Sequence, residues 1–398
     1  MPAPDTSAQK LYYILCQALA ERPLAERTDP VDWPSLTSAD WQALPALARR
    51  EGVAPLLYAK LKAGGERIPA AVMAALAAEY YRTAAQNTLL LGELDRILAA
   101  LDAAGIPVIV LKGAALAQTL YPDPALRPMG DLDLLVKPGD LKRAVQSLAD
   151  LGYGEYLPNA APGLTQRLSH HVHLRQRQLP HLIVELHYRL LGSTAFGFST
   201  SGEWFMENAR LWQEKYLQAQ AVYVPSPTAH LLYLLAHAVL QHGSGEAILL
   251  WYYDVAILLR QQGAGINWQQ LQQQAQACQW GSALAAGLRI VQDRLQVELP
   301  LQAEICLADT PDAYADFVAC RRSPAHSRWE LEAHKLSNLP WRERLVLIGA
   351  LVFPAPAYMR WRYRPPLGWL WPLYYPYRWI DITMDFFKTL WIAARKTK

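Results

Sequence analysis

The chain has 398 residues, of which 52% are hydrophobic and 18% are charged, and this composition excludes a largely disordered protein. At about 100–200 residues per domain, the length predicts two or three packed units. The net charge of +3 argues against a general nucleic-acid-binding protein.

The cysteines and the apolar segments indicate the cellular compartment. The four cysteines are far apart and form no C-x-x-C pair, which excludes a disulfide scaffold or a zinc ribbon and suits a reducing cytosol. Met1–Arg22 lacks the apolar centre of a signal peptide. The longest uninterrupted apolar run, Leu345–Phe353, has about half the length that a membrane span needs. We therefore expect a cytoplasmic protein.

Residues 1–104 have the pattern of a helical region. Ser35 and Thr37 are capping-type residues at the start of a predicted helix over Leu36–Glu51. Ala70–Ala104 is rich in Ala, Leu and Glu and ends at Gly105, which predicts a long helix with at most one break.

Residues 105–192 alternate between strand and helix patterns, and this alternation predicts a compact α/β unit. A proline-rich loop, Tyr121–Gly130, interrupts the alternation. The predicted elements are strands at Ile106–Leu111, Leu132–Val136, His170–Arg175 and Leu182–Leu190 and helices at Lys112–Leu120 and Pro138–Leu151.

Residues 193–345 return to helical periodicity. In this region, Asp254 lies within an apolar helix, where we expect a buried partner, either an arginine or one of the histidines His230, His237 and His242. We expect these three histidines to pack in the core or to line a cleft. The predicted helices are Glu203–Leu217, Pro227–Leu240, Ala247–Arg260, Trp268–Trp280 and Ser282–Val297.

Residues 346–398 form an aromatic and basic tail. From position 358 onward it holds eight Lys and Arg, two Asp and 12 of the 41 aromatic residues of the chain. One interpretation is a tail packed over the helical domain with its arginines in solvent. The alternative is peripheral contact of residues 358–398 with a membrane surface, which favours aromatic and basic residues together.

Two carboxylates share one face of the second predicted strand. Asp131 and Asp133 are two positions apart, so their side chains emerge side by side. Such a pair is costly beside an apolar strand unless a cation compensates it, and Mg²⁺ prefers oxygen ligands. The triplet by itself is weak evidence, because a turn aspartate followed by a strand-edge aspartate has the same pattern.

Three neighbouring features favour a phosphate-handling site. Lys112 and Gly113 end the first strand and open a helix, where free backbone N–H groups suit a phosphate. Arg127 lies four residues before Asp131 and is a candidate to contact a triphosphate. Glu185 lies in an otherwise apolar strand, where an unpaired carboxylate is costly.

Together these residues resemble the DNA polymerase β-type nucleotidyltransferase superfamily, and most of all its bacterial branch of uncharacterised members. The similar segments are L-K-G-A, then Y-P-D-P-A-L-R-P-M-G-D-L-D-L-L-V, then I-V-E-L-H-Y, within residues 106–190. Ala114 departs from the usual pattern, which has Gly or Ser there. The resemblance implies an α+β fold: a small mixed-sheet nucleotidyltransferase core flanked by N- and C-terminal helical regions.

The resemblance also implies the roles of the site residues. Asp131, Asp133 and Glu185 would be catalytic and would bind Mg²⁺ or Mn²⁺. Nucleotide binding would fall to Lys112, Gly113, Arg127 and Gly130. The implied reaction transfers a nucleoside monophosphate from an NTP such as ATP to a hydroxyl of an unidentified acceptor, which is a small molecule, a sugar or a peptide.

A second cluster consists of five histidines around the last predicted strands: His170, His171, His173, His181 and His187. A zinc site is conceivable here. We favour ordinary strand and loop histidines, with His187 supporting Glu185.

Two further functional classes stay open beside the enzyme. One is a non-catalytic nucleotide-binding module that has kept the fold. The other is a membrane-surface accessory protein of envelope or natural-product assembly, which is compatible with enzymatic activity.

Overall fold

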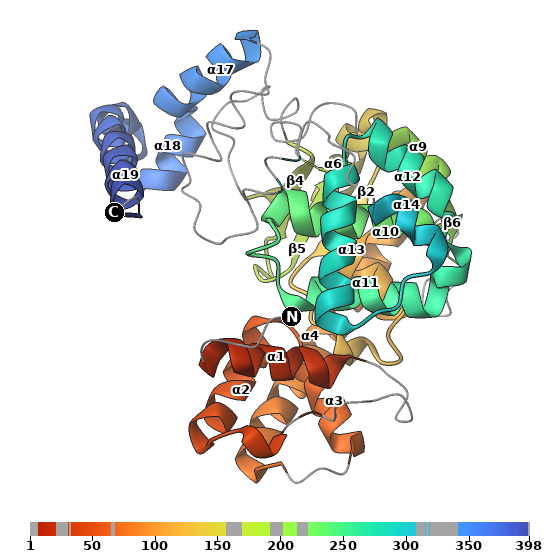
Figure 1. Cartoon of the computed structure of the whole chain (residues 1–398). Helices are drawn as coiled ribbons and strands as arrows, with labels where there is room; N and C mark the ends of the chain where they lie inside the picture. The colour runs from red at the N-terminus through yellow and green to blue at the C-terminus, as the bar shows by residue number, and fades with distance from the viewer. Residues whose placement is uncertain are drawn as a thin grey trace.

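The computed structural model describes residues 7–20, 31, 33–64, 68–156, 169–191, 202–212, 222–307, 315, 318 and 341–396. It has an α+β architecture in which one mixed sheet is surrounded by helices (Figure 1). Cys320 and the last part of the helix expected at Glu203–Leu217 lie outside the described residues.

Helices occupy the N-terminal region, as its periodicity predicts. The capping box is formed as expected at Thr37, whose hydroxyl accepts from the N–H of Asp40 while the Asp40 carboxylate accepts from the N–H of Thr37. The long helix is unbroken. The helices are α1 (Ser7–Leu19), α2 (Ser38–Arg50), α3 (Ala54–Gly64) and α4 (Ala70–Ala103).

The sheet has seven strands in the order β3-β4-β5-β2-β1-β7-β6. Neighbouring strands are antiparallel except at β2/β5 and β1/β7, which are parallel. The strands are β1 (Val108–Val110), β2 (Leu132–Leu135), β3 (Tyr153–Glu155), β4 (His171–Gln176), β5 (Ile183–His187), β6 (Ala209–Leu211) and β7 (Val222–Pro225).

Three of these strands were not expected from the sequence. The prediction of a helix over Glu203–Leu217 is correct only at its start. The helix α9 (Gly202–Glu207) ends at Glu207, and strand β6 follows. Strands β3, β6 and β7 are three or four residues long, which is too short for a period-two pattern. The sheet therefore continues beyond residue 192, where the sequence placed the end of the core.

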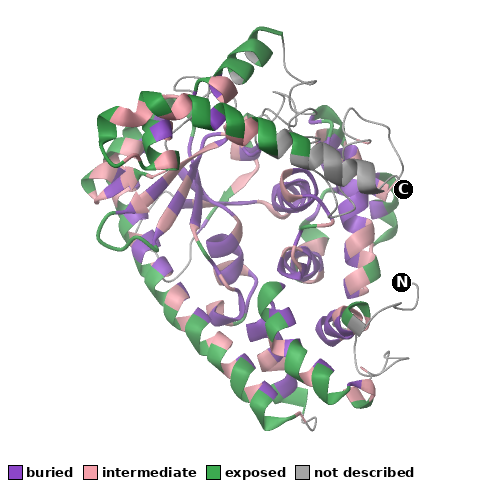
Figure 2. Cartoon of the chain, turned by 90° about the vertical axis from the view of Figure 1, so that its left-hand side faces the viewer, coloured by how far each residue is buried: buried purple, intermediate pink, exposed green. Residues whose placement is uncertain are grey.

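The two faces of the sheet contact different helices. Leu132 and Leu134 of β2 face a core shared with α4 and with α6 (Leu141–Asp150). Leu135 instead joins the larger core that contains the C-terminal helices. Because side chains alternate along a strand, Asp131 and Asp133 lie on the same face as Leu135, beneath those C-terminal helices. Figure 2 shows the strands largely buried, whereas the long helix α4 is exposed along much of its length.

The C-terminal helices follow the predicted periodicity with one difference. The helix expected over Pro227–Leu240 changes at His237 into a π-helical turn, η5 (His237–His242). The elements are α5 (Lys112–Thr119) beside the sheet, then α10 (Pro227–Ala236), η5, α11 (Leu249–Gln262), α12 (Trp268–Ala277), α13 (Gly281–Leu295) and α14 (Glu304–Leu307).

The tail forms α17 (Trp341–Val352), α18 (Pro356–Tyr363), the 3₁₀ segment η8 (Gly368–Tyr374) and α19 (Tyr375–Lys396). In Figure 1 these helices lie together to one side of the sheet and its helices. This differs from a tail packed over the helical domain. None of the helices in the described part of the chain is long and apolar enough to cross a bilayer.

Candidate active site

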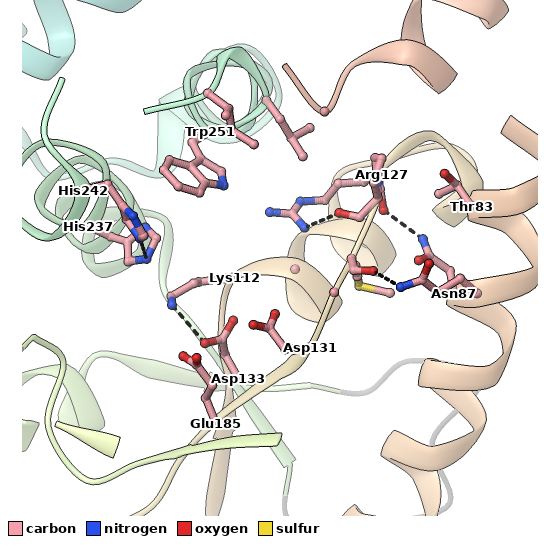
Figure 3. Close-up of a pocket in the computed structure, with 18 of the residues that line it drawn as sticks. Thr83, Asn87, Lys112, Arg127, Asp131, Asp133, Glu185, His237, His242 and Trp251 are labelled. Carbon is pink, nitrogen blue, oxygen red and sulfur yellow. Dashed lines mark hydrogen bonds and ion pairs between the residues drawn. The ribbon is translucent and has the colours of Figure 1, made fainter. Parts of the chain in front are cut away.

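The register of β2 and β5 brings the three predicted carboxylates together. These strands are parallel, with Asp133 opposite Glu185, and Asp131 is two residues earlier on the same face. All three carboxylates line one pocket of about 470 Å³ (Figure 3). The sheet thus places side by side two carboxylates that are 52 positions apart in the sequence.

Asp133 is held by Lys112 and His187. Its Oδ1 accepts a hydrogen bond of 2.9 Å from Lys112 Nζ and lies 2.9 Å from Nε2 of the fully buried His187. Burial acts to raise the pKa of Asp133, but Lys112 and His187 together hold that pKa well below its usual range. Asp133 is therefore ionised, and its carboxylate already interacts with Lys112 and His187.

Asp131 has a different environment. Within the described residues, no group donates a hydrogen bond to its carboxylate. Burial, together with repulsion from Asp133 and Glu185, raises the pKa of Asp131 to about 7. A carboxylate that is costly to ionise for these reasons is stabilised by a cation placed between the acidic groups.

The start of α5 lies beside these carboxylates. Lys112 has a φ of 38°, a left-handed conformation that is uncommon outside glycine and that turns the chain from β1 into the helix. Gly113 comes next, and a Cβ there would lie 2.9 Å from Nη1 of Arg127 and 3.2 Å from Cγ of Met129. Glycine is required at this position because the loop before β2 packs directly against the helix start.

That loop is fixed by Arg127. Its Nε and Nη2 donate to Oδ1 and Oδ2 of Asp254 on α11, at 2.9 and 2.7 Å, and both residues are buried. Asn87 of α4 donates to the carbonyl of Arg127 at 2.8 Å. We expected either an arginine or a histidine as the buried partner of Asp254, and the structure shows that it is an arginine. Arg127 lines the pocket, but its guanidinium is already bound in a two-point ion pair.

The opposite wall of the pocket is aromatic. Trp251 of α11 lies across the pocket from Glu185, with His237 and His242 to one side (Figure 3). The π-helical turn places His237 and His242, five residues apart, on one face, with their Nε2 atoms 3.2 Å apart. Their ring centroids are 5.3 and 4.4 Å from that of Trp251.

The structure thus brings into one pocket all seven site residues predicted from the sequence. Gly130 is among them, and it lies where an added Cβ would meet nothing within 4 Å. Trp251 and Asn87 also line the pocket and were not predicted from the sequence. No local signal distinguishes them, because each lies in an ordinary helix far from the motif along the chain.

The donor set fits a divalent cation of the Mg²⁺ type. Asp131, Asp133 and Glu185 offer only carboxylate oxygens, which hard cations prefer. Burial and the neighbouring carboxylates of Asp133 and Glu185 raise the pKa of Asp131, and Lys112 offsets this only in part.

The histidine cluster lies next to these carboxylates on β4 and β5. His171 is opposite His187 and His173 is opposite Glu185, so all four side chains share one face. Burial, together with the neighbouring imidazole of His187, lowers the pKa of His171 to about 3. His181 is exposed in the turn before β5 and stands apart from the cluster.

Comparisons with known proteins found a matching family and a similar solved structure. A family model described as "Uncharacterised nucleotidyltransferase" matches residues 37–296. Among solved structures, the chain is similar to the solution structure of the antibiotic-resistance factor ANT(2'')-Ia, with 14% sequence identity and a TM-score of 0.34. That match covers 44% of this chain and 86% of the other. No curated protein matches the chain.

Proposed function

This chain belongs to the family of uncharacterised nucleotidyltransferases, and from that premise we propose that it transfers a nucleoside monophosphate from an NTP to a hydroxyl group of an acceptor. The observation that carries the proposal is the carboxylate group Asp131, Asp133 and Glu185 on the wall of a pocket that also holds Lys112. This pocket offers oxygen ligands for a cation and a positively charged side chain for phosphate oxygens.

The three carboxylates would hold the divalent cation, Mg²⁺ or Mn²⁺. When bound, the cation would neutralise charge on the triphosphate and would polarise the reacting phosphate. Lys112 and His187 keep Asp133 ionised and in place. With its pKa raised to about 7, Asp131 must be in its ionised form when the ion binds.

The residues at the start of α5 and in the loop before β2 would receive the phosphates. Lys112 supplies charge, while Gly113 and Gly130 let the backbone approach the ligand because neither has a side chain. From the sequence we expected Arg127 to be a free cation that contacts the triphosphate, but it would act differently. Its ion pair with Asp254 fixes the loop that presents Gly130 and Asp131, so Arg127 is a positioning residue.

In the proposed reaction the acceptor oxygen forms a bond to the α-phosphorus and the bond between the α- and β-phosphates breaks. Pyrophosphate leaves, and the proton of the hydroxyl passes to solvent. The chain's own residues contribute alignment, because the pocket holds the NTP and the acceptor against the same carboxylates. Trp251 provides a flat aromatic surface across the pocket, which suits stacking of the nucleobase.

Calorimetric titration of the full chain with Mg²⁺ and each NTP tests the proposal. We expect the wild type to bind an NTP only when Mg²⁺ is present, and Asp131→Asn and Asp133→Asn to abolish that binding. Asp150→Asn is the matched control, since Asp150 is an exposed carboxylate on α6. Equal Mg²⁺-dependent binding by the wild type and both site variants would refute the assignment. No binding by the wild type would favour the non-catalytic module.

The tail supports a second, compatible candidate function at a membrane surface. Trp369 is 71% exposed, Leu373 is 70% exposed and Tyr377 is 60% exposed, in a segment that also carries arginines. Co-sedimentation with anionic vesicles tests this candidate. Binding by the wild type that is lost on combining Trp369→Ser with Leu373→Ser supports it, whereas no binding by the wild type excludes it.

A further inference from the structure

We propose that His171, His173 and Glu185 form a binding site for one divalent transition-metal ion, such as Zn²⁺, separate from the Asp131–Asp133 pair. The site lies on β4 and β5, on the same face of the sheet as the carboxylates of the pocket. It shares Glu185 with the proposed magnesium site, and its other two ligands, His171 and His173, are not part of that site.

The sheet aligns three donors at suitable separations. His171 and His173 are two residues apart on β4, and His173 is opposite Glu185 on β5. One donor atom from each of the three residues lies within 4.8 Å of the other two. Glu185 Oε1 is 3.4 Å from His173 Nδ1, and Glu185 Oε2 is 3.7 Å from His171 Nδ1. Ligands about 2.1 Å from a tetrahedral zinc ion lie about 3.4 Å from one another.

Unsatisfied polar atoms point to a missing ligand. The Nδ1 atoms of His171 and His173 are both buried, and neither has a hydrogen-bond partner. Leaving buried polar atoms unpaired is unfavourable. An ion between the two imidazoles and Glu185 would satisfy both nitrogens at once.

The donor types distinguish this site from the neighbouring carboxylates. Two imidazoles and one carboxylate suit Zn²⁺, Co²⁺ or Fe²⁺, whereas Mg²⁺ prefers oxygen ligands. The Nε2 atoms of His171 and His173 lie 2.7 Å apart. Binding through both Nδ1 atoms requires the tautomer with a proton on each Nε2, so this contact must open when the ion enters.

His187 supports the site rather than forming it. Its Nε2 lies 2.9 Å from Asp133 Oδ1 and 3.5 Å from Glu185 Oε2. A histidine between two carboxylates fixes the orientation of both, as groups around metal ligands commonly do. Access is available from the His173 side, where the side chain is 29% exposed.

The experiment is titration of the metal-free full chain with Zn²⁺ by calorimetry and with Co²⁺ by visible absorption, both without Mg²⁺ or nucleotide. We expect the wild type to bind one ion and to give the intense d–d bands of a four- or five-coordinate Co²⁺ centre. His171→Ala and His173→Ala should each lower the affinity at least tenfold. His181→Ala is the matched control and should leave the affinity unchanged, since His181 is exposed outside the cluster.

Asp131→Asn separates this site from the proposed magnesium site, and we expect it to bind Zn²⁺ as the wild type does. Because His173 is partly exposed, His173→Gln serves as a second variant if a substitution of His171 disturbs folding. The proposal is overturned if the wild type binds neither ion, if the His171 and His173 variants bind as tightly as the wild type, or if Asp131→Asn abolishes binding. None of these measurements involves a nucleotide, so failure of this proposal is distinct from failure of the proposed function.

Discussion

Arg127 and Asp254 form a buried two-point ion pair that joins the loop before β2 to α11, across 127 positions of the chain. Tyr121 donates a third hydrogen bond of 2.7 Å to the same aspartate. The pair connects the wall of the pocket that carries the acidic residues to the wall that carries Trp251. This ion pair, which is not part of the sheet, therefore holds the two walls of the pocket together.

Breaking this pair should destabilise the protein. Asp254→Asn leaves a buried guanidinium without its counter-ion, and such losses cost about 3–5 kcal/mol. Chemical denaturation of the wild type and the variant measures the change in the free energy of unfolding. Arg143→Ala is the control, because Arg143 pairs with Asp140 at the exposed surface, where an ion pair contributes about 1 kcal/mol or less. Equal effects of the two substitutions would contradict the assigned role.

Gly113 and Gly130 should respond differently to alanine. In Gly113→Ala the new methyl group meets Arg127 Nη1 at 2.9 Å, and such overpacking costs about 1–3 kcal/mol, more than the ~1 kcal/mol that alanine gains in a helix. Gly130→Ala meets no atom within 4 Å and should leave stability unchanged. Thermal unfolding of both variants at one pH is the measurement. A Gly130 variant that is less stable than the Gly113 variant would refute the steric argument.

Asp131→Asn should stabilise the metal-free protein at alkaline pH. The pKa of Asp131 is raised from its ordinary value of 3.8 to about 7 in the folded state. Between these values the unfolded chain loses the proton first, so this carboxyl reduces stability as the pH rises. The advantage of the asparagine variant should grow from about pH 4 to about pH 7 and then level off. Denaturation midpoints at several pH values check this, and a pH-independent difference would contradict it.

The same group should make metal-dependent nucleotide binding sensitive to pH. A divalent cation needs the ionised form of Asp131, so the apparent affinity for Mg²⁺ and NTP should fall below the pKa of about 7. With one proton displaced, the expected slope is up to about tenfold per pH unit. Mn²⁺ titrations followed by electron paramagnetic resonance, without nucleotide, isolate this proton from those of the NTP. Unchanged Mn²⁺ affinity between about pH 5.5 and pH 7 would show that Asp131 is not a ligand.

Trp251→Leu should weaken NTP binding without changing the dependence on Mg²⁺. Stacking on an aromatic ring contributes about 1–3 kcal/mol per base, which corresponds to roughly fivefold to 150-fold in affinity. The matched control is Trp369→Leu, since Trp369 is 71% exposed in the tail and outside the pocket. Unchanged NTP affinity in Trp251→Leu would indicate that this wall receives the acceptor instead of the base.

The parts of the fold predicted correctly are those with local signals. The long helix that begins at Ala70, the capping box at Thr37 and the strand with Asp131 and Asp133 follow from periodicity and from side-chain chemistry within a few residues. Strands β6 and β7 had no such signal, because a strand of three or four residues is stabilised by its neighbours in the sheet and not by its own sequence.

That Asp131 and Asp133 share a face can be predicted from their spacing alone, since alternation along a strand is a property of the backbone. The sequence also shows that Glu185 and Asp254, as carboxylates in apolar segments, require partners. The identity of these partners depends on how the chain folds. Strand pairing places Glu185 opposite Asp133 and beside His173. Packing of α11 on the loop before β2 pairs Asp254 with Arg127. The cation that contacts Asp133 is therefore Lys112. Partner choice depends on contacts between segments that are far apart in the chain, and local sequence does not encode those contacts.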